Sequence, residues 1–182
     1  MAAGFTSLVC GPNYSRYTSN NGILWTSDAE YAPPSQTFSI NSHLQHSLQT
    51  LRSFPPDVSS PSGRSCYRLL VTPGLSLVRA TFTYSNYDSL NQPPMFGVAI
   101  GPTLYNAVDL ALRDPWVEEI ILNATESQAF CLIAMTGTPV ISLLEIRRLP
   151  PGAYSHASPI LGVLLRKIYR LDCGSDSQTT TR

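Results

Sequence analysis

Apolar and polar residues alternate most regularly between Leu77 and Asp88. One side of a two-residue period carries Val78, Ala80, Phe82 and Tyr84, and the other side carries Arg79, Thr81 and Thr83. Successive side chains of a strand point to opposite faces of its sheet, so this pattern predicts a half-buried strand with the apolar set facing the core. A polar turn, Ser85–Ser89, follows the strand.

Other short apolar stretches are separated by Pro, Gly, Asn and Asp. We expect strands over Phe5–Cys10, Gly22–Asp28, Leu48–Phe54, Cys66–Val71, Leu77–Tyr84, Met95–Ile100, Trp116–Leu122, Ala129–Met135 and Val140–Arg147. Residues 31–37 and 57–65 are rich in Pro and Ser and are predicted loops. Many short strands with turn signals between them predict an all-β sandwich rather than alternating βαβ units.

One segment has a different period. Between Leu104 and Arg113, apolar residues recur at i, i+3, i+4, i+7 and i+8, with Thr103 as an N-cap and Pro115 as a stop. Judged locally, this segment is a short helix.

Composition narrows the classes of function. Of the 182 residues, 43% are apolar, which allows a sizeable core, and 13% are charged, against about a quarter in an average soluble domain. Twelve basic residues balance twelve acidic ones, so the chain lacks the basic footprint of a nucleic-acid binder. No signal-peptide pattern opens the chain, and its apolar run at Ile160–Leu165 is far shorter than the ~20 residues of a membrane helix.

The four cysteines are far apart and form no C-x-x-C pair, which argues against a structural zinc site or a redox motif. Two N-glycosylation sequons, starting at Asn13 and Asn123, favour an oxidising compartment. We therefore treat both asparagines as glycosylation candidates.

Catalytic residue patterns are scarce. The histidines His43, His46 and His156 have no partner at a spacing that suits a metal site or a Cys–His nucleophile. The adjacent carboxylates Glu118 and Glu119 lie on opposite faces of a predicted strand and cannot act as a pair. We predict no enzyme activity, no metal and no cofactor.

Five stretches, in order and with similar spacing, resemble the malectin-like domain found in the ectodomains of plant leucine-rich-repeat receptor-like kinases. They are W-T-S-D-A-E-Y at 25–31, L-R-S-F-P at 51–55, R-S-C-Y-R-L at 64–69, V-R-A-T-F-T-Y-S-N-Y-D at 78–88, and C-L at 131–132 followed by T-G-T-P-V-I-S at 136–142 and L-E-I-R at 144–147. The resemblance covers residues 4–149.

This resemblance implies a galactose-binding-like, jelly-roll β-sandwich over residues 4–149, with a strand rather than a helix near Leu104–Arg113. The stretch Arg170–Asp176 resembles Ser7–Asn13, and Tyr169–Ser177 is similar to the start of a further lobe. Because such receptors often carry two lobes in tandem, residues 150–182 are expected to be a linker and the truncated start of a second lobe. The implied location is extracellular, in an ectodomain at the plasma membrane.

The resemblance also implies a function. Malectin binds oligosaccharide through aromatic rings and a carboxylate, and the residues of those types here are Tyr84, Asn86, Tyr87 and Asp88. The expected function is a non-catalytic module that binds cell-wall glycan. The alternative is a module that binds a protein or peptide, with a co-receptor ectodomain as a further partner and no glycan.

One disulfide at most is expected within residues 1–149. Cys173 lies beyond the lobe and is expected to be free, because bonded Cα atoms must come within about 7 Å. The expected bond joins Cys66 with either Cys10 or Cys131.

Overall fold

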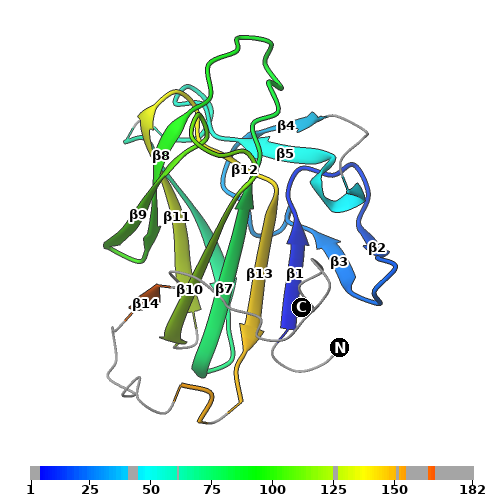
Figure 1. The fold of residues 1–182 in the computed structure, drawn as a ribbon, viewed down its shortest axis with the longest axis vertical. Coiled ribbons are helices and arrows are strands. Elements are labelled where there is room, and N and C mark those ends of the chain that lie inside the picture. Colours follow the sequence, from blue (N-terminus) through cyan, green and yellow to red (C-terminus); the bar gives the residue numbers. More distant parts are fainter. Residues whose placement is uncertain are drawn as a thin grey trace, which may run out of the picture.

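A computed structural model of the chain describes residues 5–40, 45–60, 62–124, 127–150, 152–154 and 164–166. These residues form a β-sandwich, as the sequence predicts (Figure 1). Its strands are β1 (Phe5–Val9), β2 (Arg16–Thr18), β3 (Leu24–Ser27), β4 (Gln36–Ser39), β5 (Thr50–Ser53), β6 (Arg64–Leu70), β7 (Gly74–Phe82), β8 (Met95–Ile100), β9 (Thr103–Asp109), β10 (Trp116–Ala124), β11 (Ser127–Thr136), β12 (Val140–Ile141), β13 (Leu143–Arg148) and β14 (Leu164–Arg166). A 3-10 helix, η1 (His46–Leu48), precedes β5. Within the described residues, no helix is long and apolar enough to cross a membrane.

The strands form three sheets around one main core. The sheet orders are β14-β10-β7-β13-β1-β3-β2, β6-β11-β8-β9 and β12-β5-β4. All three contribute to the core: Leu8 and Phe82 from the first sheet, Tyr67 and Phe96 from the second, and Leu51 from the third. A smaller cluster of Val9, Trp25 and Leu143 lies apart from this core.

Strand β7 lies inside the largest sheet, between β10 and β13. Its predicted phase is confirmed, because Val78, Ala80, Phe82 and Tyr84 all belong to the core cluster. The expectation of a half-buried strand is wrong, since Arg79 is only 8% exposed. Its guanidinium lies 2.6 Å from Glu119 on β10 and 3.7 Å from Glu145 on β13. These ion pairs allow the polar face of the strand to be buried as well.

The segment with a helical period is a strand, as the resemblance implies. Strand β9 pairs with β8 from Met95–Asp109 to Ile100–Thr103. In this conformation Val108 enters the core, while Leu104 is 54% exposed. Pairing with a neighbouring strand overrides the local helical period.

Besides β14, two short strands have no counterpart in the sequence prediction. Strand β2 pairs with β3 through Arg16–Thr26, Tyr17–Trp25 and Thr18–Leu24. Strand β4 pairs with β5 and occupies part of a predicted loop. Both are short and polar, so no apolar alternation marks them.

The cysteines separate into a bonded pair and a buried thiol. Cys66 on β6 and Cys131 on β11 are register partners, with Cα atoms 4.0 Å apart, and form a disulfide. Cys10, the other candidate partner for Cys66, is a buried free thiol whose pKa is raised well above its ordinary value by burial. Cys173 and the proposed start of a second lobe lie outside the described residues.

Strand β14 adds a segment from beyond Leu149 to the largest sheet. It pairs with β10 through Leu164–Leu122, Leu165–Ile121 and Arg166–Ile120. The division into a lobe over 4–149 and a linker with a second lobe over 150–182 stays a prediction.

Candidate binding surfaces

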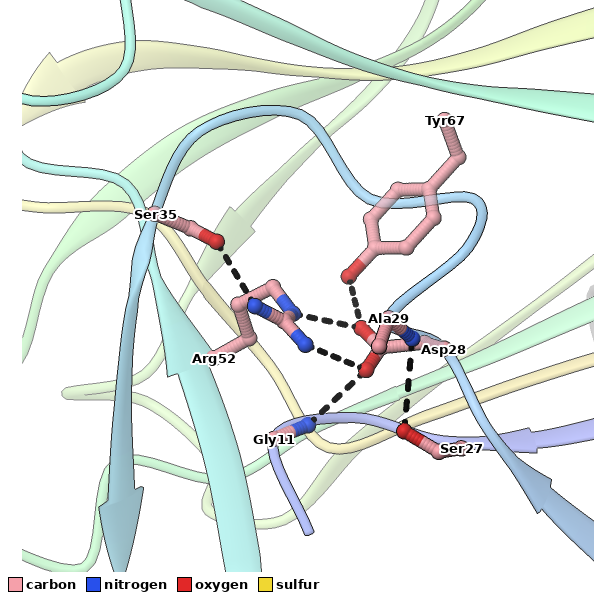
Figure 2. A network of polar contacts seen from close by, with 7 residues as sticks. All are labelled: Gly11, Ser27, Asp28, Ala29, Ser35, Arg52 and Tyr67. Atoms are coloured by element: carbon pink, nitrogen blue, oxygen red, sulfur yellow. Dashed lines mark hydrogen bonds and ion pairs between the residues drawn. The ribbon is translucent and has the colours of Figure 1, made fainter. Parts of the chain in front are cut away.

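Three of the sequence motifs meet at the carboxylate of Asp28, which is fully buried (Figure 2). Arg52 donates to it from Nε and Nη2, each at 2.6 Å. The Tyr67 hydroxyl donates at 2.7 Å, and the backbone N–H of Gly11 donates at 3.0 Å. This network, the Asp28 hub, joins the segments that follow β1 and β3 to strands β5 and β6.

Electrostatics favour one charge state in the Asp28 hub. Burial lowers the pKa of Arg52, but the hydrogen bonds to Asp28 and its negative charge outweigh this effect and raise the pKa. Burial, followed by the neighbouring Cys10 and Asp28, raises the pKa of Tyr67 well above its ordinary value. The hub therefore holds an ionised arginine and a neutral phenol around a carboxylate that solvent does not reach. These motif residues support the fold and offer no surface to a ligand.

The four predicted ligand-binding residues are brought together after β7. The Tyr84 hydroxyl lies 2.6 Å from Oδ1 of Asp88 and 3.2 Å from Oδ1 of Asn86. The same oxygens accept backbone N–H groups of the loop, from Leu90 to Asp88 and from Asn91 to Asn86. The polar atoms of this cluster, the Tyr84 loop, therefore stabilise a turn in which Ser85, Asn86, Ser89 and Asn91 have positive φ.

The surface beside the Tyr84 loop is small. Tyr84 is 4% exposed, and its pKa is raised by burial and by donation to Asp88. The half-buried ring of Tyr87 packs against Phe38, with ring centroids 4.6 Å apart. The adjoining pocket has a volume of about 120 Å³, below the ~300 Å³ at which small-molecule sites begin.

A larger groove is lined by residues of β1, of β3 and of the segments next to these strands. Within the described residues, these two parallel strands pair through Leu8–Thr26 and Val9–Ser27 alone, and β3 pairs with β2 on its other edge. The resulting cavity, which we call the β1–β3 groove, has a volume of about 780 Å³. Its wall includes Phe5, Ser7, Tyr14, Leu24, Glu30 and Tyr31.

The β1–β3 groove combines exposed apolar groups with one charge. Phe5 is 37% exposed and Leu24 is 40% exposed. The pKa of Tyr14 is raised to about 12 by burial and by Tyr17, so its hydroxyl is neutral at physiological pH. Among the described residues that line the groove, only Glu30 carries a charge. No local sequence pattern predicts this site, because its walls come from three separate segments of the chain.

A second groove, of about 640 Å³, lies beside the β2–β3 turn. Its wall includes the rings of Tyr17 and His46 and the amides of Asn20, Asn21 and Gln45. The ring centroids of Tyr17 and His46 are 4.5 Å apart. His43 and His156 lie outside the described residues.

The two sequon asparagines have different surroundings. Asn13 is exposed and lies in the wall of the β1–β3 groove. Asn123 is half-buried within β10, where it is the register partner of Leu75 on β7. Asn13 is therefore the more accessible acceptor.

Acidic residues elsewhere serve the fold. Glu118 accepts hydrogen bonds from Asn106 and Trp116, whereas Glu119 on the opposite face pairs with Arg79, as their adjacent positions in a strand predict. In the part of the chain that the structure describes, no group of three or more His, Cys, Asp or Glu side chains could hold a metal ion.

The chain matches the family model of the malectin-like domain over residues 8–182 and belongs to that family. A probable LRR receptor-like serine/threonine-protein kinase of Arabidopsis thaliana is 34% identical over 175 residues, which cover 91% of this chain and 19% of the relative. The Arabidopsis thaliana kinase MEE39, also a probable LRR receptor-like kinase, is 37% identical over 83% of this chain and 18% of its own length. The chain thus spans about a fifth of these relatives.

Solved structures share the fold at low sequence identity. The plant receptor-like kinase FER superposes with a TM-score of 0.68 at 19% identity, over 81% of this chain and 42% of FER. The ANX2 ectodomain from Arabidopsis thaliana gives 0.66 at 17% identity, over 80% and 42%. A structure of the plant peptide RALF23 in complex with FER and LLG2 matches with a TM-score of 0.62 at 18% identity, over 81% of this chain and 40% of the matched chain.

Proposed function

We propose that this chain is a non-catalytic recognition lobe in the extracellular part of a plant receptor-like kinase, and that it binds a peptide or protein partner. The kinase relatives and the shared fold support the first part of the proposal. In this setting, residues 150–182 lead from the lobe toward a second one, and Asn13 carries an N-glycan.

The observation that carries the choice of partner is the contrast between two surfaces. The Tyr84 loop uses its hydroxyl, amide and carboxylate oxygens for its own turn and adjoins a pocket of about 120 Å³. The β1–β3 groove is about 780 Å³ in volume and has exposed Phe5 and Leu24 in its wall. A large, partly apolar groove suits a peptide or protein segment, whose side chains bury apolar area on binding.

A relative supports the same choice. FER, whose fold this chain shares, has been captured in a complex with the peptide RALF23 and with LLG2. A peptide and a second protein are therefore the first classes of partner to test for this chain.

The test screens peptides and glycans side by side on one immobilised sample of the chain with its disulfide intact. The panel contains RALF23, LLG2, a phage-displayed library of random twelve-residue peptides, and an oligosaccharide array. We expect saturable binding of peptides that is lost in Leu24→Asp and kept in Tyr87→Ala. Saturable binding of oligosaccharides with no enriched peptide and no protein partner would overturn the proposal.

Glycan binding is the second candidate function. The aromatic rings and amides of the second groove, at Tyr17, His46, Asn20 and Gln45, are groups that stack on sugars and bond to their hydroxyls. The Tyr84 loop, with Tyr87 and Asp88, is the other proposed sugar site. If oligosaccharide binding is lost in Asn20→Ala, the sugar site is the second groove. If it is lost in the double variant Tyr87→Ala/Asp88→Ala, the sugar site is the Tyr84 loop.

A further inference from the structure

The N-terminal half of β1 has one edge that faces a groove instead of a strand. On the other edge, β1 pairs with β13 over its whole length, from Phe5–Arg147 to Val9–Leu143. Toward β3, the ladder within the described residues consists of the pairs Leu8–Thr26 and Val9–Ser27. Phe5, Thr6 and Ser7 therefore lie beside the β1–β3 groove, whose wall they help to form.

Hydrogen bonds show which backbone groups point into the groove. The carbonyl of Val9 accepts from the N–H of Asp28, and the carbonyl of Ser7 accepts from the Thr26 hydroxyl at 3.3 Å, so both face β3. The N–H of Cys10 donates to Ser142, on the β13 side. In a strand, the N–H and C=O of one residue point to the same side, and that side alternates from residue to residue. Since Ser7 and Val9 face β3, Phe5 faces the same side. The N–H and C=O of Phe5 and the N–H of Ser7 therefore face the groove.

We propose that Phe5–Ser7 accepts an extended, positively charged peptide as an additional strand within the β1–β3 groove. This inference rests on the proposed function, which it deepens by naming how the partner binds. Main-chain hydrogen bonds to an exposed strand edge supply affinity in this mode of recognition, and pockets for alternate side chains supply specificity.

The groove wall defines the chemistry of that peptide. Exposed Phe5 and Leu24 favour apolar side chains at alternate positions. Glu30 is exposed at the groove, and it is the only charged side chain among the described residues of the wall, so it favours a lysine or arginine. Partly buried Tyr14 and Tyr31 complete the wall with aromatic surface.

The test uses peptides recovered from the random twelve-residue phage library, made synthetically and titrated by fluorescence anisotropy. Phe5→Pro removes the Phe5 N–H and the ring, whereas Phe5→Ala removes only the ring. Proline is tolerated at the first residue of a strand, and equal melting temperatures of the two variants check that both fold. We expect Phe5→Pro to bind the peptide about fivefold more weakly than Phe5→Ala, because one hydrogen bond to the peptide is lost.

A second pair of measurements tests the charge. We expect Lys→Gln or Arg→Gln in the selected peptide to weaken binding to the wild-type chain and to leave binding to Glu30→Gln unchanged. Equal affinities of Phe5→Pro and Phe5→Ala, or a charge effect that persists in Glu30→Gln, would overturn strand addition while peptide recognition itself stands.

Two other outcomes also overturn the inference. If neither the library nor RALF23 gives a peptide that binds, strand addition fails, and the proposed function fails with it only if LLG2 does not bind either. If peptides bind only Asn13→Gln and not the glycosylated chain, the glycan on Asn13 is the occupant of the groove.

Discussion

Asp28 belongs to the W-T-S-D-A-E-Y motif, and its role in the structure is to join distant segments of the chain. Its carboxylate accepts from Gly11, Arg52 and Tyr67, which belong to segments far apart in the sequence. Because the carboxylate is fully buried, each donor replaces a water molecule that an exposed aspartate would bind. The motif that identifies the family is therefore a structural signature, and a binding role does not follow from it.

Asp28→Asn should destabilise the chain strongly. The substitution leaves the buried guanidinium of Arg52 without its counter-charge, and breaking a buried ion pair costs about 3–5 kcal/mol of unfolding free energy. The matched control is Glu30→Gln, two residues away and exposed, which should change this energy by less than about 0.5 kcal/mol. Urea denaturation measures both, and a similar small effect of the two variants would contradict the role of the hub.

Tyr67 gives the hub a dependence on pH. Burial raises its pKa in the folded chain above the ordinary value of 10.0. The stability that this shift contributes is therefore complete below about pH 10 and decreases as the pH rises toward the folded-state pKa. Tyr67→Phe, which removes the donor to Asp28, should cost about 1.5–3 kcal/mol at pH 7.

The difference between wild type and Tyr67→Phe should narrow above pH 10, because only the wild type loses the contribution of the phenol there. Unfolding free energies measured from pH 8 to 11 check this expectation. A difference that stays constant over this range would show that the phenol has no raised pKa in the folded chain.

At the scale of elements, the residues after β1 approach β5 closely. Gly11 has φ of +76°, and a Cβ placed there would lie 2.4 Å from the carbonyl oxygen of Leu51. Gly22 has nearly the same φ, +77°, but no atom within 4 Å of such a Cβ. The two glycines thus share a backbone conformation and differ in their surroundings.

Alanine substitutions at Gly22 and Gly11 distinguish the cost of the left-handed backbone conformation from the cost of a close contact. Gly22→Ala should cost about 1–2 kcal/mol for the left-handed conformation alone. Gly11→Ala should cost a further 1–3 kcal/mol or so, because the backbone of Leu51 must move. Chemical denaturation gives both values, and equal costs would show that the approach of the two segments is loose.

Sequence patterns predicted strands well where one side of the period enters the core. The phase of β7 follows directly from Val78, Ala80 and Phe82. The pattern did not reveal that Arg79 would also be buried, because its partners Glu119 and Glu145 are distant in sequence. In β9 the local period favours a helix, and the ladder with β8 decides otherwise.

The candidate sites were predictable to different degrees. The sequence placed Tyr84, Asn86, Tyr87 and Asp88 on one turn, and the structure brings them together. Their mutual hydrogen bonds depend on the positive-φ conformation of that turn, which the residue types do not specify. The β1–β3 groove depends on where a parallel ladder ends, and no pattern in either strand records that position.

For the whole molecule, the sandwich has a covalent link within its four-stranded sheet. Cys66 and Cys131 are 65 residues apart, and closing such a loop reduces the entropy of the unfolded chain by an amount worth about 4 kcal/mol. The bond joins β6, at one edge of the sheet, to its neighbour β11.

Replacing Cys66 and Cys131 by alanine should lower the unfolding free energy by about 2–5 kcal/mol. Reductant should weaken the wild type and Cys10→Ala by similar amounts, since Cys10 takes no part in the bond, and should leave the double variant unchanged. Thermal unfolding with and without dithiothreitol checks all three chains. A reductant effect that disappears in Cys10→Ala would contradict the Cys66–Cys131 pairing.

The proposed recognition surface and the networks that stabilise the fold thus use different residues. The Asp28 hub, the Arg79 ion pairs and the Tyr84 loop bond polar groups to one another, while Phe5 and Leu24 stay exposed in the wall of the β1–β3 groove. Hydrogen–deuterium exchange of the chain, free and saturated with a selected peptide, tests this division most directly. We expect new protection at Phe5–Ser7 and Ile23–Thr26, with no change at Tyr84–Asn91. Protection confined to Tyr84–Asn91 would contradict it and assign recognition to the loop.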